Sequence, residues 1–523
     1  MERERPPWQS NQTVPCQWSF WKPLNFLKRW RKSPGRRKRN FSCVFRLCTI
    51  LWSASTIIAC INPSGSSITI YVDSSFTGNY KTGSYLSPYT NITEAVNSLP
   101  LTDSNVEKII HVFSGTYTDT ISLNNAQNLS IEGGTDKFQW NPSSTLTITN
   151  SKDIVLRYID FQFPSTVAIS ISSSDVDLEN ITVNGTGNLI TADSSSMNGN
   201  QLTFTTTSTI YDALSFSNAE SIKLDNITVS GGNYSINVNT ANELSLTNVN
   251  LSSMNKGGIQ LNSVLNPIIS TGNIGTIPLT SDTDAAGIYI SNSHGGRIEK
   301  LTITGGGTAG SDVQNGISVF THNVVDSSLN SIFYLNDLNI QNCGRAGIYV
   351  NTSQNVWILN NTITNSRRGL FLKFPNTSPY AQDPDAAGPQ YNTVDIYKTT
   401  VENATLAGAY FENMYANIDF LVVKNTSGPG IWINNTVSNV ISKYFIGNVS
   451  ELLYNSQQGI LVNGTGMYVS VTNVKFEGNG GYGIEAPVQS DPSQFFCQGN
   501  TWISQSLTIH PNLTSNSANE CNL

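Results

Sequence analysis

The chain has 523 residues, a formal net charge of −7, and a charged fraction of 12% beside 38% hydrophobic residues. This composition excludes an intrinsically disordered chain, which would combine a high net charge with few apolar residues. It also argues against nucleic acid as a partner, because the basic cluster lies at the N-terminus and belongs to no recognition fold.

Residues 1–61 differ in character from the rest of the chain. Residues 1–60 hold 12 Lys and Arg against 2 Asp and Glu; removing them from the totals of 29 and 36 leaves 17 basic and 34 acidic residues, a net charge of −17 for the remainder. The basic run Arg36–Arg39 precedes an apolar run from Phe41 to Ile61 that contains Arg46. That order is typical of an export signal or a marginal membrane anchor, so we expect the remainder to lie outside the cell or on its surface.

The apolar run ends in Thr56-Ile-Ile-Ala-Cys60, which resembles the lipobox of bacterial lipoproteins. In that motif the Cys becomes the lipidated first residue of the mature protein. The segment departs from the motif in having Ile where Leu is usual and in the great length of the region before it. Lipidation at Cys60, an uncleaved signal-anchor and a cleaved signal remain alternatives, and contact with a membrane is expected through this segment only.

Residues 62–105 are predicted to form an N-terminal strand and a short capping helix. Thr90 or Asn91 can cap a helix that begins near Ile92, and Glu94 stands at the capping-box distance from Asn91. This helix would cover the open end of the repeats that follow. Without a cover, that end would expose apolar side chains and unpaired strand edges.

Residues 106–490 repeat one phrase, a pair of apolar residues separated by one other residue and usually preceded by Gly. The copies are Ile169/Ile171, Ile236/Val238, Ile259/Leu261, Ile288/Ile290, Ile317/Val319, Ile348/Val350, Leu370/Leu372, Ile431/Ile433 and Ile460/Val462. Neighbouring copies return after about 22 to 31 residues, a period typical of solenoids. Because apolar positions alternate with a period of two, the repeat favours strands over helices and predicts a parallel β-helix with its apolar pairs inside.

A second register of Asn and Asp accompanies the apolar pairs. It comprises Asn180, Asn226, Asn248, Asp337, Asn361 and Asn473. Asn tolerates left-handed backbone angles and can bond to its neighbour in a stack, so these residues are predicted to form the corners of successive coils.

The chain resembles the right-handed parallel β-helix proteins of the pectin lyase-like superfamily. The resemblance covers roughly residues 68–490, from the Tyr71-Val-Asp73 and Thr82-Gly-Ser84 segments through the Gly-Ile-x-Ile/Val phrases. It implies an all-β, single-stranded right-handed parallel β-helix. It does not select an activity, because the superfamily contains lyases, hydrolases, epimerases, phage tailspikes and surface proteins that are not enzymes.

The residue between the two apolar positions points outward from the coil, and in six successive coils it is mostly aromatic. With the weaker copy Ala409/Phe411 added, these residues are Tyr289, Ser318, Tyr349, Phe371, Tyr410 and Trp432. Coils stack about 4.8 Å apart, so the rings are predicted to form a stripe that suits the apolar faces of a sugar chain. The alternative is that the insertion at 374–393 and the loops at 264–284 and 305–314 cover the stripe and bury it.

Signals for catalysis are weaker. The resemblance implies carboxylates that hold Ca²⁺ beside an Arg or Lys base in lyases, and paired Asp residues in hydrolases. Arg368, Lys373 and Glu412 fall near the stripe and are weak catalytic candidates. Asp383 and Asp385 are weak candidates for a metal, and their alternative role is to cap the turn that leads into the next coil. No cofactor is predicted apart from Ca²⁺ in the case of a lyase.

Residues 491–523 lose the repeat and are predicted to form a second cap. Cys497 and Cys521 are expected to pair in an oxidising compartment, whereas Cys343 is expected to be an inert core thiol. Three functional classes remain for the whole chain. The first is a surface protein that binds a glycan along the stripe, the second is a polysaccharide lyase or glycoside hydrolase that uses the same groove, and the third is a structural surface protein without a ligand.

Overall fold

The structure is a computed structural model that describes residues 66–164, 166–278, 285–307, 314–320, 332–353, 355–374, 393–436, 442–486, 494–505, 507–514 and 520–521. Residues 1–61, with Cys60, lie outside the described residues, as do Asp383 and Asp385. The described segments contain no helix that is long and apolar enough to cross a membrane. The predictions for the N-terminal segment and for a metal at Asp383 and Asp385 therefore stay predictions.

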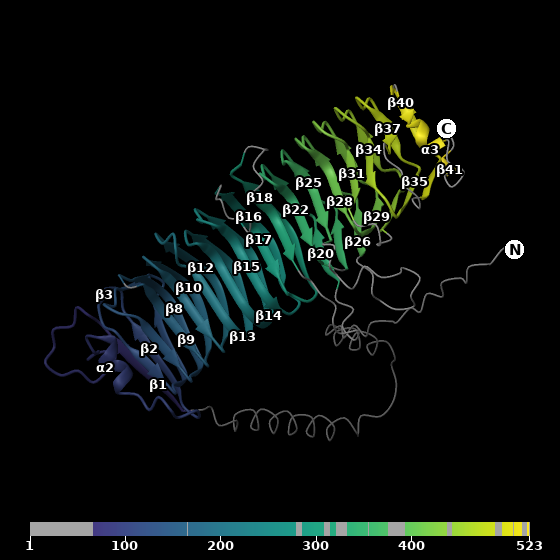
Figure 1. Cartoon of the computed structure of the whole chain (residues 1–523). Coiled ribbons are helices and arrows are strands. Elements are labelled where there is room, and N and C mark those ends of the chain that lie inside the picture. The colour runs from purple at the N-terminus through teal and green to yellow at the C-terminus, as the bar shows by residue number, and fades with distance from the viewer. Residues whose placement is uncertain are drawn as a thin grey trace, which may run out of the picture. The chain divides into compact units, whose positions relative to one another are not determined.

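Ser66–Leu523 forms one compact unit, a parallel β-helix in which each coil stacks on the coil before it (Figure 1). Strand β13 (Leu214–Ser230) shows the path of one coil. Its first part pairs with β14 (Tyr234–Ser252) on one face, the chain bends at Asn218, pairs again on the next face, bends at Asn226, and pairs on a further face. The coil is thus three-sided, and every strand pairing between coils is parallel, as the sequence predicts.

Successive strands form three faces, named here in the order in which the first coils reach them. The first face contains β1 (Ser67–Val72), β2 (Glu107–Val112), β5 (Gln127–Gly133), β20 (Phe333–Asn336), β23 (Val356–Leu359), β26 (Thr393–Tyr397), β29 (Tyr415–Asp419), β32 (Ser442–Gly447), β35 (Met467–Thr472), β38 (Gln494–Gln498) and β41 (Glu520–Cys521). The second face contains β3 (Thr116–Tyr117), β6 (Phe138–Trp140), β21 (Asn339–Gln341), β24 (Thr362–Thr364), β27 (Thr400–Glu402), β30 (Val422–Lys424), β33 (Glu451–Leu453), β36 (Lys475–Glu477) and β39 (Thr501–Ile503). The third face contains β4 (Ser122–Asn124), β7 (Leu146–Thr149), β9 (Val167–Ser172), β11 (Asn188–Asp193), β15 (Gly257–Val264), β17 (Ala286–Ser291), β19 (Asn315–Phe320), β22 (Ala346–Asn351), β25 (Arg368–Lys373), β28 (Ala407–Glu412), β31 (Ile431–Asn435), β34 (Ile460–Gly464), β37 (Tyr482–Glu485) and β40 (Leu507–Ile509). Long strands turn from the first face to the second without a break, namely β8 (Lys152–Gln162), β10 (Asp175–Gly185), β12 (Ser196–Thr206), β16 (Ile268–Ile277) and β18 (Gly296–Gly305).

The interior is filled by the apolar pairs of the repeat. Both members of all nine pairs are buried, with exposed fractions of 2% or less. Fully burying one such side chain stabilises the fold by roughly 1.5–3 kcal/mol relative to leaving it exposed. The Gly before seven of the nine pairs has a steric cause. At Gly347, for example, a Cβ would lie 2.9 Å from the carbonyl oxygen of Gly369 in the next coil.

The Asn corners are confirmed at five of the six predicted positions. Asn180, Asn226, Asn248, Asp337 and Asn473 have φ angles of 52–56°, in the left-handed region. The prediction is wrong for Asn361, since the corner residue in that coil is Asn360 with φ 54°. Asn361 points inward instead, and its amide accepts from the N–H of Leu338 and donates to the carbonyl of Leu335, both at 2.9 Å.

The first coil is closed by helix α2 (Ile92–Asn97). The side chain of Asn91 accepts a hydrogen bond from the N–H of Glu94 at 2.7 Å, which confirms Asn91 as the cap. Ile92, Ala95 and Val96 are buried in the main core. The helix is short, and its place at the end of the solenoid is visible in Figure 1.

The C-terminal end differs from the prediction that residues 491–523 leave the repeat. Strands β38, β39 and β40 pair in parallel with β35, β36 and β37, so a further coil continues past residue 490 to Ile509. This coil lacks the apolar phrase, which is why the pattern misses it. The disulfide Cys497–Cys521 joins β38 to β41 and confirms the predicted pair, and the short helix α3 (Pro511–Thr514) lies between β40 and β41.

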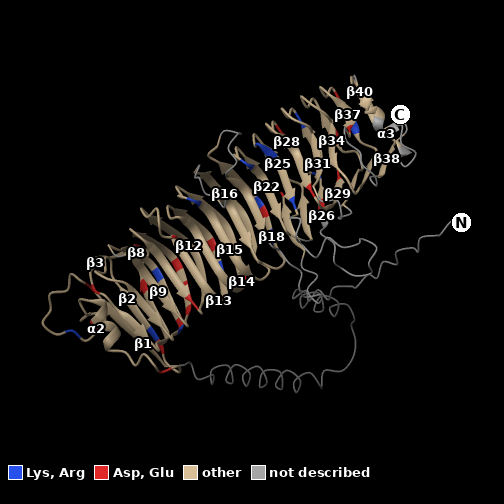
Figure 2. Ribbon diagram, viewed as in Figure 1, with Lys and Arg blue, Asp and Glu red and all other residues tan. Residues whose placement is uncertain are grey.

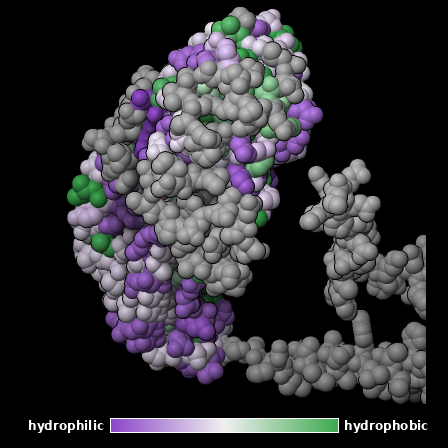
Figure 3. All heavy atoms as spheres, turned by 45° about the vertical axis from the view of Figure 1, so that its right-hand side comes forward, coloured by the Kyte–Doolittle hydropathy of each residue, from purple (hydrophilic) through white to green (hydrophobic). Residues whose placement is uncertain are grey.

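The described surface is largely polar. Lys, Arg, Asp and Glu are sparse along the ribbon, and the side of the molecule seen in Figure 3 shows only small separate hydrophobic patches (Figure 2, Figure 3). Side chains other than charged ones therefore carry most of the surface chemistry.

Candidate functional site

The predicted aromatic positions fall in one register on the third face. Tyr289, Ser318, Tyr349, Phe371, Tyr410 and Trp432 are paired strand by strand from β17 to β31. Phe320, at the neighbouring outward position of β19, fills the place that Ser318 leaves. The rings therefore run on without a gap as Tyr289, Phe320, Tyr349, Phe371, Tyr410 and Trp432, with neighbouring centroids 4.8–5.2 Å apart, and we call them the aromatic row.

Burial divides the aromatic row into a middle and two ends. Tyr349, Phe371 and Tyr410 are 4%, 7% and 8% exposed and form a small hydrophobic cluster of their own, separate from the main core. Tyr289 and Phe320 at one end, and Trp432 at the other, are only partly buried. The expectation that the whole stripe faces solvent is therefore wrong for its middle, which is buried. The insertion at 374–393, which the alternative names as a cover, lies outside the described residues apart from its two ends.

Two arginines lie over the buried rings. The guanidinium of Arg345 is 4.3 Å from the ring centre of Tyr349, and that of Arg368 is 4.6 Å from the ring centre of Phe371. Such contacts stabilise a desolvated cation by roughly 0.5–2 kcal/mol. Burial, with smaller contributions from Arg367 and Arg345, lowers the pKa of Arg368 to about 10, so it stays charged at neutral pH.

A Lys–Glu pair adjoins the aromatic row at its Tyr410 position. Lys373 Nζ lies 3.2 Å from Glu412 Oε1, and the hydroxyl of Tyr410 donates to Glu412 Oε2 at 3.2 Å. The side-chain amide of Asn434 donates to the same hydroxyl at 2.9 Å. Burial is the main cause that raises the pKa of Tyr410, so its hydroxyl keeps its proton and can donate.

The structure thus brings together the predicted residues Tyr349, Phe371, Tyr410, Arg368, Lys373 and Glu412. Sequence reasoning missed Arg345, which stands two residues before the Gly of its repeat phrase, whereas Arg368 directly precedes the Gly of the next coil. Both oxygens of Glu412 are engaged by Lys373 and Tyr410, which leaves this carboxylate poorly placed for proton transfer to a substrate.

Metal binding finds no support in the part of the chain that the structure describes. There, no group of three or more His, Cys, Asp or Glu side chains is arranged to hold an ion. Cys343 is fully buried, and burial raises the pKa of its thiol to about 12, as expected of a core thiol.

Comparison with known proteins identifies the architecture. Residues 212–372 and 328–501 match the family described as the right-handed beta helix region. The curated proteins contain no significant match.

Several solved structures match the chain at low identity and with low TM-scores. One is the catalytic domain of a GH87 alpha-1,3-glucanase in complex with nigerose, with a TM-score of 0.35 and 14% identity over 84% of this chain and 70% of that one. A second is the catalytic unit of a GH87 alpha-1,3-glucanase from Streptomyces thermodiastaticus strain HF3-3, with a TM-score of 0.26 and 13% identity over 86% of this chain and 70% of that one. A third is the A-module of the mannuronan C-5 epimerase AlgE4 from Azotobacter vinelandii, with a TM-score of 0.32 and 12% identity over 69% of this chain and 96% of that one.

Proposed function

The chain belongs to the right-handed β-helix family, and on that premise we propose that it binds a carbohydrate along the aromatic row of its third face. The observation that carries the proposal is the continuity of the row. Six rings from successive coils touch in sequence, and its two ends, Tyr289 with Phe320 and Trp432, keep part of their surface exposed.

The buried middle of the row would serve as a rigid base for the exposed ends. Flat rings match the apolar faces of pyranoses, while amides and charged groups beside them can bond to hydroxyls. Asn434 and the partly exposed Lys373 supply such groups near Tyr410. A rigid surface loses little side-chain conformational entropy when it binds a ligand.

Display outside the cell is part of the same proposal. It is supported by the order of basic and apolar residues at positions 36–61 and by the disulfide Cys497–Cys521, which persists in an oxidising compartment.

A structural role for the row is the second candidate. It is favoured by the low exposure of Tyr349, Phe371 and Tyr410, because a buried ladder of rings stabilises the stack whether or not a ligand binds. Bond cleavage has less support, since the groups of Lys373 and Glu412 that would act on a substrate are occupied by each other.

The two candidates are separated by affinity electrophoresis of the full chain in gels that contain soluble neutral and acidic polysaccharides. Binding predicts slower migration of the wild type with at least one polysaccharide and loss of that shift in Trp432→Ala. The matched control is Trp357→Ala, a partly exposed tryptophan of β23 on the first face, which should keep the shift. Unchanged migration of the wild type across the panel would favour the structural role.

A further inference from the structure

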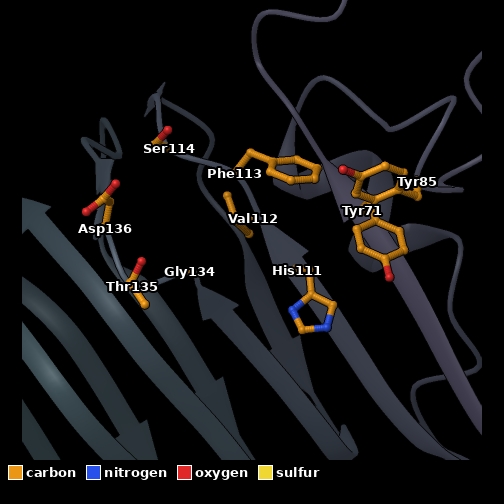
Figure 4. A pocket seen from close by; sticks show the side chains of 9 residues that line it. All are labelled: Tyr71, Tyr85, His111, Val112, Phe113, Ser114, Gly134, Thr135 and Asp136. Carbon is orange, nitrogen blue, oxygen red and sulfur yellow. The ribbon is translucent and has the colours of Figure 1, made fainter.

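A pocket of about 330 Å³ lies on the first coils of the solenoid (Figure 4). The aromatic row begins only at β17. It is lined by Tyr71 of β1, His111 of β2, Phe113 directly after β2, Tyr85 from the segment between β1 and α2, and Thr135 and Asp136 from the loop after β5. Four aromatic or imidazole rings thus meet from segments that are separate in the sequence.

The rings of Tyr71, His111 and Phe113 form a continuous wall, and the ring of Tyr85 stands edge-on beside it. Tyr71 stacks with His111 at 5.4 Å and 26° and lies nearly parallel to Phe113 at 6.1 Å and 23°. Tyr85 stands edge-on to Tyr71 at 5.4 Å and 89°, and to Phe113 at 5.8 Å and 66°. Because these rings touch one another, a quaternary ammonium group has no room between them, and the pocket is a stacking wall rather than an aromatic cage.

The wall is open to solvent. Tyr85 is 64% exposed and Phe113 is 36% exposed, in contrast to the buried rings in the middle of the aromatic row. Clustered exposed rings that pack against one another usually mark a binding surface.

The ring of His111 begins a series of polar side chains that contact one another along the first face. His111 Nδ1 lies 3.0 Å from Glu132 Oε1, and Arg157 contacts Glu132 at 3.9 Å and Glu179 at 2.9 Å. Figure 2 shows red and blue residues side by side in this part of the ribbon. The contact with Glu132 fixes the orientation of the imidazole, which stacks with Tyr71.

The side of the pocket opposite the rings is polar. Ser114, Thr135 and Asp136 lie opposite the rings in Figure 4. The described residues that line the pocket include the carboxylate of Asp136 but no Lys or Arg. A carboxylate accepts hydrogen bonds from sugar hydroxyls and repels anionic ligands such as uronates.

We propose that this pocket is a second carbohydrate site, in which a neutral pyranose packs on Tyr71 and Phe113, is bounded by Tyr85, and donates hydroxyl hydrogen bonds to Asp136. The volume suits a sugar unit at the end or side of a glycan, and the wall is preformed. The site is separate from the aromatic row, because it lies on the first coils, whereas the row runs along the third face from β17 to β31.

The test is isothermal titration calorimetry of the full chain with neutral tetrasaccharides of glucose, mannose and galactose, a tetrasaccharide of galacturonate, and choline. We expect at least one neutral tetrasaccharide to bind, with an affinity about tenfold weaker in Tyr85→Ala. The matched control is Tyr80→Ala, which alters a tyrosine of the same segment that is 84% exposed and does not line the pocket. Asp136→Asn should keep the neutral sugar within a few-fold and bind galacturonate better than the wild type does.

The proposal is overturned if no neutral tetrasaccharide binds, if galacturonate or choline binds better than every neutral sugar, or if Tyr85→Ala and Tyr80→Ala behave alike. Trp432→Ala separates this site from the aromatic row. Binding that survives Trp432→Ala and weakens in Tyr85→Ala supports the proposed site in the pocket. Binding that is lost in Trp432→Ala alone supports binding at the aromatic row and overturns the proposed site in the pocket.

Discussion

Lys373 and Glu412 face each other across the adjacent strands β25 and β28, with Nζ 3.2 Å from Oε1. The other carboxylate oxygen of Glu412 accepts a hydrogen bond from the hydroxyl of Tyr410. The side chain of Glu412 is 12% exposed and that of Lys373 is 37% exposed. The buried carboxylate therefore depends on its two partners, and this charged contact ties the exterior of one coil to the next.

Removing the ammonium group of Lys373 should lower the free energy of unfolding. Lys373→Ala is expected to destabilise the fold by about 1–2 kcal/mol, because it leaves a poorly hydrated carboxylate with Tyr410 alone, while the half-open position of Lys373 limits the loss. Glu412→Gln should cost less in the Lys373→Ala background than in the wild type. Urea unfolding of the two single variants and the double variant measures the coupling, and additive losses would show that the pair contributes nothing.

The two parts of the aromatic row should respond differently to truncation. Phe371→Ala is expected to cost about 3 kcal/mol, the range for a buried ring, whereas Tyr289→Ser should cost about 1 kcal/mol or less because its ring is partly exposed. Thermal unfolding followed by circular dichroism compares the two. Equal losses would show that Tyr289 is held as tightly as Phe371.

The shared interior should not tolerate a charge. Ile348 is fully buried between coils, so Ile348→Asp places an unpaired carboxylate in the stack and is expected to prevent accumulation of folded protein. Asn351→Asp, at an outward position of the same strand, is the control and should fold normally. Expression and limited proteolysis report both, and a stable Ile348→Asp protein would contradict the assignment of the core.

The thiol of Cys343 should not react with alkylating reagents in the native protein. Burial raises its pKa to about 12, so the reactive thiolate is scarce at pH 9, and the site is closed to reagents as well. In the unfolded chain the pKa returns to its ordinary value, so reactivity should appear with denaturant and grow from pH 7 to 9. Iodoacetamide labelling with mass spectrometry of the peptide that contains Cys343 checks this, and ready native labelling at pH 8 would refute it.

The N-terminal segment makes a prediction that does not depend on the β-helix. If Cys60 is lipidated, labelled palmitate should be incorporated by the wild type and lost in Cys60→Ser, while Cys48→Ser, within the same apolar run, should keep the label. Equal labelling of all three proteins, or none, would leave the signal-anchor or the cleaved signal as the explanation.

The sequence alone predicted the winding and the register of the chain. Each coil must bury alternate side chains, so the apolar pairs recur at one point of every coil, and Tyr349, Phe371, Tyr410 and Trp432, each enclosed by such a pair, had to align on one face. Asn91 as a helix cap and the pairing of Cys497 with Cys521 were also predicted, because a cap is a local signal and the two cysteines stand apart from the repeat.

Only the tertiary structure decided how much of each ring meets solvent and which side chains lie over it. An outward position in a solenoid is exposed or buried according to what packs on that face, so the burial of Phe371 beneath Arg368 does not follow from strand periodicity. The pocket of Tyr71, Tyr85 and Asp136 could not be predicted for the same reason, since Tyr85 and Asp136 come from loops whose paths toward β1 no local pattern encodes.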